Sequence, residues 1–263
     1  MLLHGFLDSS AGWRAVGRQL PGRTWALDLP GFGRSDCPSR PEIGAYAARI
    51  GAAVERLCDE PVVLVGHSFG GAVAVELLRR EPDRIAGAVL VAPAGFGGLP
   101  LAAFGRYRLS NELAAAVLPL GLANPLVCGA TYMGLIARRP PSPRLLARAF
   151  LSAPRARAGV RAALGTLAEL AQPRGRFRGP FDYPGELRVV WGARDRLVPA
   201  HHAEVLRAAF AQARVEIWPR VGHHPQAEAP ERLVRTIQRS CERAGRARRS
   251  LRPSAGPVEQ QAA

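Results

Sequence analysis

The sequence predicts an α/β fold, with a mostly parallel sheet and helices on both of its faces. Three observations predict it. Short apolar runs rich in valine and leucine alternate with helix-forming segments along the chain. The run Pro61–Val65 leads directly into Gly66-His67-Ser68-Phe69-Gly70. Residues 95–180 contain no alternating or β-branched run, which predicts a helical lid inserted into the sheet.

The expected elements follow in order along the chain. Strands are expected near Met1–Leu3, Thr24–Leu27, Val62–Val65, Ala88–Val91, Leu187–Trp191 and Val215–Trp218. Helices are expected near Gly44–Leu57, Ser68–Arg80, Ala200–Ala211 and Ala229–Gln238. Alternation of this kind places the active-site loops at the carboxyl ends of parallel strands.

This layout divides the chain into four segments. Residues 1–94 form the first part of the core, 95–180 the helical lid, and 181–242 the second part of the core. The last helix is expected to end near Arg239–Ser240, and residues 243–263 are expected to form a disordered basic tail.

Ser68 is the candidate nucleophile. A Gly-x-Ser-x-Gly between a strand and a helix puts its serine on a tight turn that small residues must flank. Gly71–Arg80 continues as a buried helix, whose N-terminus adds positive potential beside the hydroxyl.

A serine nucleophile needs a base and a residue that orients the base. Asp195 follows an apolar strand and a glycine turn, and Gly222-His223-His224-Pro225 follows the last strand. The order Ser, Asp, His is the one expected for a nucleophile elbow on an α/β sheet. By its place in the sequence, Asp195 also fits a turn aspartate, and His224 is an alternative base. The N–H groups of Phe6 and Phe69 are candidate donors to an oxyanion.

Several ordered motifs resemble the α/β-hydrolase family over nearly the whole chain. They are His4-Gly5-Phe6, Asp28–Asp36, Gly66–Gly70, Gly192-x-x-Asp195 and Gly222-His223-His224-Pro225-x-x-Glu228-x-Pro230. The resemblance implies that His223, directly after the glycine, is the general base. It also implies a lid that sets substrate choice. A serine in place of a carboxylate nucleophile argues against a dehalogenase or an epoxide hydrolase. The mechanism needs no metal and no organic cofactor.

One departure from the family concerns the start of the chain. Most relatives carry an antiparallel hairpin before the His-Gly motif, whereas this sequence opens on that motif's own strand. The expectation is that the N-terminal strands are missing, or that the start is misassigned. The strand near Thr24–Leu27 is then an exposed edge.

The lid carries much of the formal charge of +15. Residues 95–180 hold twelve arginines against Glu112 and Glu169, a formal +10. Arginines lining the cleft would attract a carboxylate-bearing substrate, and arginines on a solvated helix face would not. The uncharged stretch Leu113–Ala137 has the length of a membrane span, but its prolines and glycines favour lid helices over an apolar pocket.

The basic residues and the cysteines predict which partners and which compartment the protein has. Every basic residue counted in the charge is an arginine, which resembles a coding bias, so no nucleic-acid partner is expected. Membrane contact is not expected either, and the oligomeric state is open. Cys37, Cys58, Cys128 and Cys241 have neither metal-ligand spacing nor a paired framework. Free thiols and the lack of a visible signal peptide predict a cytoplasmic protein.

The predicted function is therefore a serine hydrolase that cleaves an ester or related acyl bond of a small, largely apolar substrate through an acyl-enzyme. A carbon–carbon bond hydrolase of a ring-cleavage product, or a cofactor-free haloperoxidase or perhydrolase, would use the same triad. A binding module that keeps the pocket without turnover is the alternative outside the enzyme class.

Overall fold

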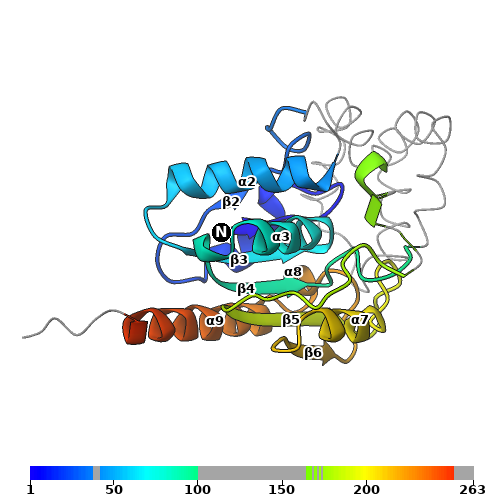
Figure 1. The fold of residues 1–263 in the computed structure, drawn as a ribbon. Helices are drawn as coiled ribbons and strands as arrows, with labels where there is room; N and C mark the ends of the chain where they lie inside the picture. The colour runs from blue at the N-terminus through cyan, green and yellow to red at the C-terminus, as the bar shows by residue number, and fades with distance from the viewer. Residues whose placement is uncertain (38–41, 100–163, 168, 171, 173, 252–263) are drawn as a thin grey trace, which may run out of the picture.

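The structure is a computed structural model, and it describes residues 1–37, 42–99, 164–167, 169, 170, 172 and 174–251. Six parallel strands form one sheet in the order β2-β1-β3-β4-β5-β6 (Figure 1). The strands are β1 Leu2–Leu3, β2 Ala26–Leu27, β3 Val62–His67, β4 Ile85–Val91, β5 Glu186–Gly192 and β6 Arg214–Trp218. This confirms the predicted fold class.

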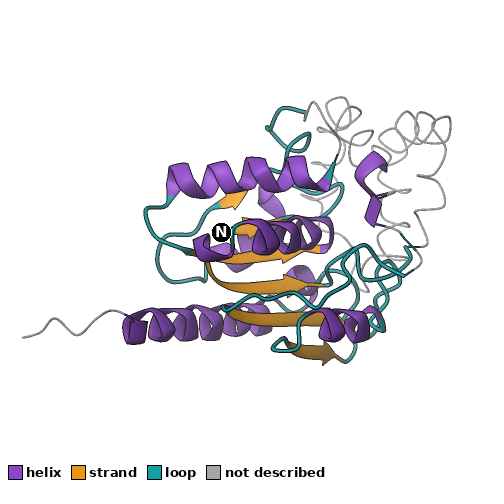
Figure 2. Cartoon of the chain, in the orientation of Figure 1, coloured by secondary structure: helices purple, strands orange, loops and turns teal. Residues whose placement is uncertain are grey.

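The helices lie on both faces of the sheet (Figure 2). The α-helices are α1 Arg14–Gly17, α2 Ile43–Leu57, α3 Ser68–Arg80, α7 His202–Ala209, α8 Pro225–Glu228 and α9 Pro230–Leu251. Short 3-10 turns cover Ser10–Trp13 and Pro82–Arg84. Within the predicted lid, residues 164–167, 169 and 170 are helical, and residues 100–163 lie outside the described part.

Two apolar clusters, one on each face, hold the sheet between the helices. Because successive strand residues point to opposite faces, Leu64, Ala88 and Leu90 join α2, α3 and α7 in the larger cluster. Val65, Val89 and Val91 join α1 and α9 in the other. This alternation fixes the register of the central strands, since a shift by one residue would exchange the two sets.

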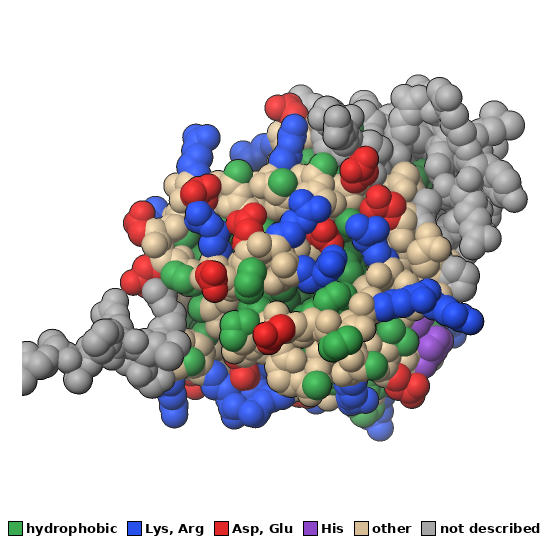
Figure 3. All heavy atoms as spheres, viewed as in Figure 1, with side chains coloured by type: hydrophobic (Ala, Val, Ile, Leu, Met, Phe, Trp, Pro, Cys, Tyr) green, Lys and Arg blue, Asp and Glu red, His purple; other side chains and the backbone are tan. Residues whose placement is uncertain are grey.

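β2 lies at one edge of the sheet, as the sequence indicated for the segment near Thr24–Leu27. On the molecular face that Figure 3 shows, basic and acidic side chains are interspersed over the described surface. In the described part of the chain, no helix combines the length and the apolar character that a membrane crossing requires.

The prediction for the last helix was wrong. α9 runs from Pro230 to Leu251 and does not end near Arg239–Ser240. Arginine and alanine favour helix, and Ala244 is buried on the sheet, where a Cβ atom on Gly87 would lie 3.4 Å from its Cβ. Arg243 lies 3.8 Å from a carboxylate oxygen of Glu186 on β5. Residues 252–263 of the predicted tail lie outside the described part.

This packing predicts that the extension of α9 stabilises the fold. Ala244→Arg should lower the free energy of unfolding by about 1–3 kcal/mol, because a larger side chain must be forced between helix and sheet. The matched control is Ala247→Arg, at an exposed position one turn further along the same helix, which should change stability little. Urea denaturation of both variants measures the difference, and equal midpoints would contradict the docking.

Candidate active site

Ser68 lies at a sharp turn between β3 and α3. It has a φ of 51°, a left-handed conformation that is unusual for a residue other than glycine. Glycines on either side make the turn possible. A Cβ on Gly66 would come within 2.5 Å of the Gly70 carbonyl oxygen, and a Cβ on Gly70 would collide with the carbonyl oxygens of Leu3 and His4. These contacts explain why the pentapeptide Gly66–Gly70 needs glycine at both ends.

Ser68, His223 and Asp195 form one chain of hydrogen bonds. Ser68 Oγ lies 2.9 Å from His223 Nε2, and His223 Nδ1 lies 2.7 Å from Asp195 Oδ2. The three residues follow β3, β5 and β6 at the carboxyl edge of the sheet. An ionised Asp195 can only accept, so His223 donates from Nδ1, and its Nε2 is left to accept the proton of the Ser68 hydroxyl.

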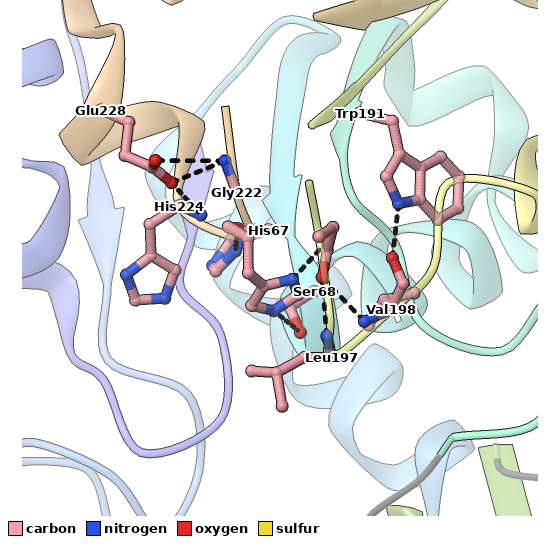
Figure 4. A network of polar contacts seen from close by, with 10 residues as sticks. His67, Ser68, Trp191, Leu197, Val198, Gly222, His224 and Glu228 are labelled. Atoms are coloured by element: carbon pink, nitrogen blue, oxygen red, sulfur yellow. Dashed lines mark hydrogen bonds and ion pairs between the residues drawn. The ribbon is translucent and has the colours of Figure 1, made fainter. Parts of the chain in front are cut away.

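The second oxygen of Asp195 is also used. Oδ1 accepts hydrogen bonds from the main-chain N–H groups of Leu197 and Val198, each at 2.9 Å. Asp195 is therefore both a turn aspartate and the partner of His223, so the two interpretations of this residue are compatible. The Trp191 indole donates to the Val198 carbonyl oxygen at 2.7 Å and holds the same turn (Figure 4).

His224, the alternative base, takes a different position. The structure brings His223, and not His224, to Ser68 and Asp195. The His224 ring lies against His67, with 4.8 Å between the ring centroids. Burial, and then the neighbouring His223, lower the pKa of His224 to about 3.

Phe6 and Phe69, the predicted oxyanion donors, lie on two segments that adjoin Ser68. Phe69 is in the first turn of α3, whose N–H groups have no acceptor within the helix. Phe6 follows Gly5, where an added Cβ would lie 3.3 Å from Ser68 Cβ. His4 braces this loop, because its Nδ1 donates to Gly5 O at 2.7 Å and its Nε2 accepts from the Leu29 N–H at 2.9 Å.

Comparison with known proteins gives the family. The sequence model described as "Alpha/beta hydrolase family" matches residues 1–236. This chain belongs to the alpha/beta hydrolase family. LipZ of Mycobacterium tuberculosis, a protein named as a hydrolase, is 30% identical over 257 residues, covering 88% of this chain and 84% of LipZ.

Solved structures show the same fold. An α/β-hydrolase-fold protein from Burkholderia ambifaria is 26% identical, with a TM-score of 0.68, and the match covers 90% of this chain and 88% of that one. An esterase from Thermogutta terrifontis is 21% identical, with a TM-score of 0.68, and the match covers 92% of this chain and 89% of that one. At that identity the esterase shows the fold alone.

Three side chains outside the predicted site hold the main chain around Asp195 and His223. Trp191 holds the Asp195 turn, and His67 and Glu228 contact the main chain around His223. Glu228 follows His224, the N-cap of α8, by four residues and reaches back to its N–H. This resembles the returning carboxylate of a capping box, although that motif has Ser or Thr at the N-cap and its carboxylate three residues later, so the sequence gives only a weak signal here. His67 and Trp191 give no comparable local signal.

Asp28 supports the loop formed by the motif Asp28–Asp36. Its carboxylate accepts from the N–H of Ser10 at 2.7 Å and from the N–H of Arg34 at 3.0 Å. Partial burial alone would raise the pKa of Asp28, but these donors outweigh it, and the pKa is held below its ordinary value. Gly33, with a φ of 57°, passes so close to this carboxylate that a Cβ would collide with it.

The lid predictions fall largely outside the described residues. The stretch Leu113–Ala137 and nine of the twelve lid arginines are in residues 100–163. The three described ones, Arg174, Arg176 and Arg178, are exposed.

Among the described residues, no three histidine, cysteine, aspartate or glutamate side chains gather as they would around a metal ion.

The close packing at Gly70 predicts a strong difference between two glycine variants. Gly70→Ala should lower the free energy of unfolding by about 1–3 kcal/mol, because its methyl group would be forced against main-chain oxygens. In the control Gly17→Ala, the methyl group would meet Leu2 and Thr24 at 3.6 and 4.0 Å, ordinary contact distances. That helix-favouring change should be neutral or stabilising by about 0.4–1 kcal/mol. Thermal or urea unfolding compares them, and a Gly70→Ala protein as stable as wild type would contradict this packing.

The buried histidines predict a loss of stability in mild acid. Burial lowers the pKa of His4 and His67, and lowers that of His202 to about 4 and of His224 to about 3. In the unfolded chain their pKa is about 6.5. The unfolded chain thus takes up protons that the folded chain excludes, and stability present above pH 6.5 is lost as the pH falls towards the folded values.

We therefore expect the urea midpoint to fall steadily between pH 7 and pH 5, where most carboxylates are still ionised. The slope of the free energy of unfolding against pH should be smaller by about 1 kcal/mol per pH unit in His202→Gln, since this variant loses one of the protons taken up on unfolding. Midpoints that stay level across this range would show that the histidines are protonated in the folded protein.

Proposed function

We propose that this alpha/beta hydrolase is a serine hydrolase that cleaves an ester or related acyl bond of a small, largely apolar substrate through an acyl-enzyme. The observation that carries the proposal is the hydrogen-bond chain Ser68–His223–Asp195, with links of 2.9 and 2.7 Å. The name of LipZ, a hydrolase, favours the same broad class of reaction.

The proposed reaction has two halves. His223 Nε2 takes the hydroxyl proton while Ser68 Oγ bonds to the substrate carbonyl carbon, and the carbonyl oxygen becomes an oxyanion. The N–H groups of Phe6 and Phe69 donate to that oxyanion. As it collapses, the bond to the leaving alcohol breaks and His223 returns the proton to the alcohol oxygen. Water then attacks the acyl carbon while His223 takes its proton, and as the second oxyanion collapses, the bond from the acyl carbon to Ser68 Oγ breaks, His223 returns the proton to Oγ and the acid is released.

Asp195 supports the base throughout. Its carboxylate keeps the proton of neutral His223 on Nδ1 and stabilises the imidazolium that forms in each half-reaction. Because Leu197 and Val198 also donate to it, the carboxylate cannot rotate away from the imidazole without breaking those bonds. A carboxylate on the acyl group would suit the arginines of the predicted lid, residues 95–180.

A panel of chromogenic esters that differ in acyl length and charge tests the proposal. The purified protein should hydrolyse some of them, and Ser68→Ala should not. A folded wild-type protein that reacts at Ser68 with a fluorophosphonate but hydrolyses no ester would indicate carbon–carbon cleavage or perhydrolysis. A folded protein that neither labels nor hydrolyses would be a non-catalytic module, and the proposal would fall.

The roles of the two neighbouring histidines give a sharper prediction. His223→Ala and Ser68→Ala should each lower kcat by about 10³-fold or more, because they remove the base and the nucleophile. His224→Ala should cost much less activity, because it is His223 whose two ring nitrogens hydrogen-bond to Ser68 and Asp195. Steady-state kinetics on the best ester measures all three. The reverse order for the two histidines would mean that His224 is the base.

A further inference from the structure

Two side chains outside the triad hold the main chain on both sides of His223. His67 donates from Nε2 to the His223 carbonyl oxygen at 2.7 Å, and both partners are buried. Glu228 accepts from the Gly222 N–H with both carboxylate oxygens, at 3.0 and 3.1 Å, and from the His224 N–H at 3.3 Å. Figure 4 shows these contacts beside Ser68.

His67 ties the base directly to the nucleophile. It is the last residue of β3, and Ser68 follows it at once. One hydrogen bond therefore joins the nucleophile's neighbour to the main chain of His223, and a second joins Ser68 Oγ to the His223 side chain. Together with the His67–Ser68 peptide bond they close a ring between segments more than 150 residues apart in the sequence.

The tautomer of His67 follows from its surroundings. A carbonyl oxygen can only accept, so the His67 proton is on Nε2. Its Nδ1 is buried without a hydrogen-bond partner among the described residues, and a Cβ on Gly5 would come within 2.8 Å of it. Burial, and then His223, hold the pKa of His67 well below its ordinary value. A neutral ring therefore fills the space between the Gly5 loop and the base loop.

Glu228 holds the N–H groups on either side of His223. It ends the short helix α8 and turns back to the two N–H groups that flank His223. Hydrogen bonds to a carboxylate are stronger than those between neutral groups. The His223 carbonyl oxygen and the N–H groups of Gly222 and His224 lie between β6 and the start of α8. They are outside the described strands, so they take no part in the hydrogen bonding of the sheet.

We infer that His67 and Glu228 are positioning residues, which clamp the main chain of His223 so that its Nε2 is held at hydrogen-bond distance from Ser68 Oγ before substrate binds. The inference rests on the proposed function. Neither side chain touches the reacting atoms in the proposed reaction. Both act through His223, and a displacement of about 1 Å at such a base can cost about 10²-fold in rate.

The test is the rate at which a fluorophosphonate labels Ser68 in the full-length protein, together with kcat and KM for the best ester. His67→Leu and Glu228→Ala should each lower the labelling rate constant and kcat by about 10- to 100-fold, with KM little changed. His67→Gln keeps an N–H donor and Glu228→Gln keeps an acceptor oxygen, so these two variants should recover most of the loss.

Tyr183→Phe is the matched control. Tyr183 donates to the Ile85 carbonyl oxygen at 2.9 Å, which is also a buried side-chain bond to the main chain, but it lies outside the triad loops. Its loss should lower the melting temperature and leave the labelling rate unchanged. If His67→Leu, Glu228→Ala and Tyr183→Phe all lose labelling to the same extent, the effect is one of general stability and the inference is overturned.

The outcomes separate the inference from the proposed function. A folded wild-type protein that does not label defeats the proposed function. If the wild-type protein labels and His67→Leu and Glu228→Ala label at the same rate, the proposed function stands and only the positioning role of His67 and Glu228 is overturned. If those two variants do not fold, Glu228→Asp, whose shorter side chain withdraws the carboxylate, takes their place. Its labelling at the wild-type rate would overturn the inference as well.

Discussion

The direct passage of β3 into α3 at Ser68 is the constraint on which the rest of the site depends. A left-handed conformation at a serine costs of order 1–3 kcal/mol and persists only where the surroundings hold it. Here the helix start is pressed against β1, with Gly70 next to the carbonyl oxygens of Leu3 and His4. The same contact brings the Gly5 loop against Ser68, so the turn and the predicted oxyanion site are parts of one packing arrangement.

The sheet brings the triad residues near one another, and the loops complete the geometry. Parallel strands end at one edge, so the segments after β3, β5 and β6 meet there. That placement alone does not produce bonds of 2.7 and 2.9 Å. The turn after β5 is fixed by the two N–H donors to Asp195 and by the Trp191 indole, and the loop after β6 by contacts to the main chain around His223. Each loop thus has its own hydrogen bonds, independent of the Ser68–His223 link.

Local sequence patterns predicted those elements whose bounds depend on interactions between residues close in the sequence. The bounds of α3, Ser68–Arg80, agree with the prediction, because strand, glycine turn and helix follow one another without a loop. The predicted end of the last helix was wrong, because a run rich in arginine is also typical of a basic tail, whereas Ala244 is buried against the sheet and the helix continues to Leu251. The partner of His67 could not be predicted, because its acceptor is a main-chain oxygen 156 residues away and depends on tertiary packing.

The electrostatics of the neighbouring histidines bear on how the proposed base could work. Proton transfer from Ser68 puts a positive charge on His223, and a second charged imidazole nearby would oppose it. The rings of His67 and His224 both have centroids within 6 Å of the His223 ring. Burial, followed by the influence of neighbouring histidines, keeps the pKa of each below its ordinary value, so both stay neutral near pH 7. The Asp195 carboxylate, 2.7 Å from His223 Nδ1, then contacts the imidazolium and stabilises it. Burial of two neutral histidines, which costs stability in acid, thus keeps like charge away from the charge that the reaction must create.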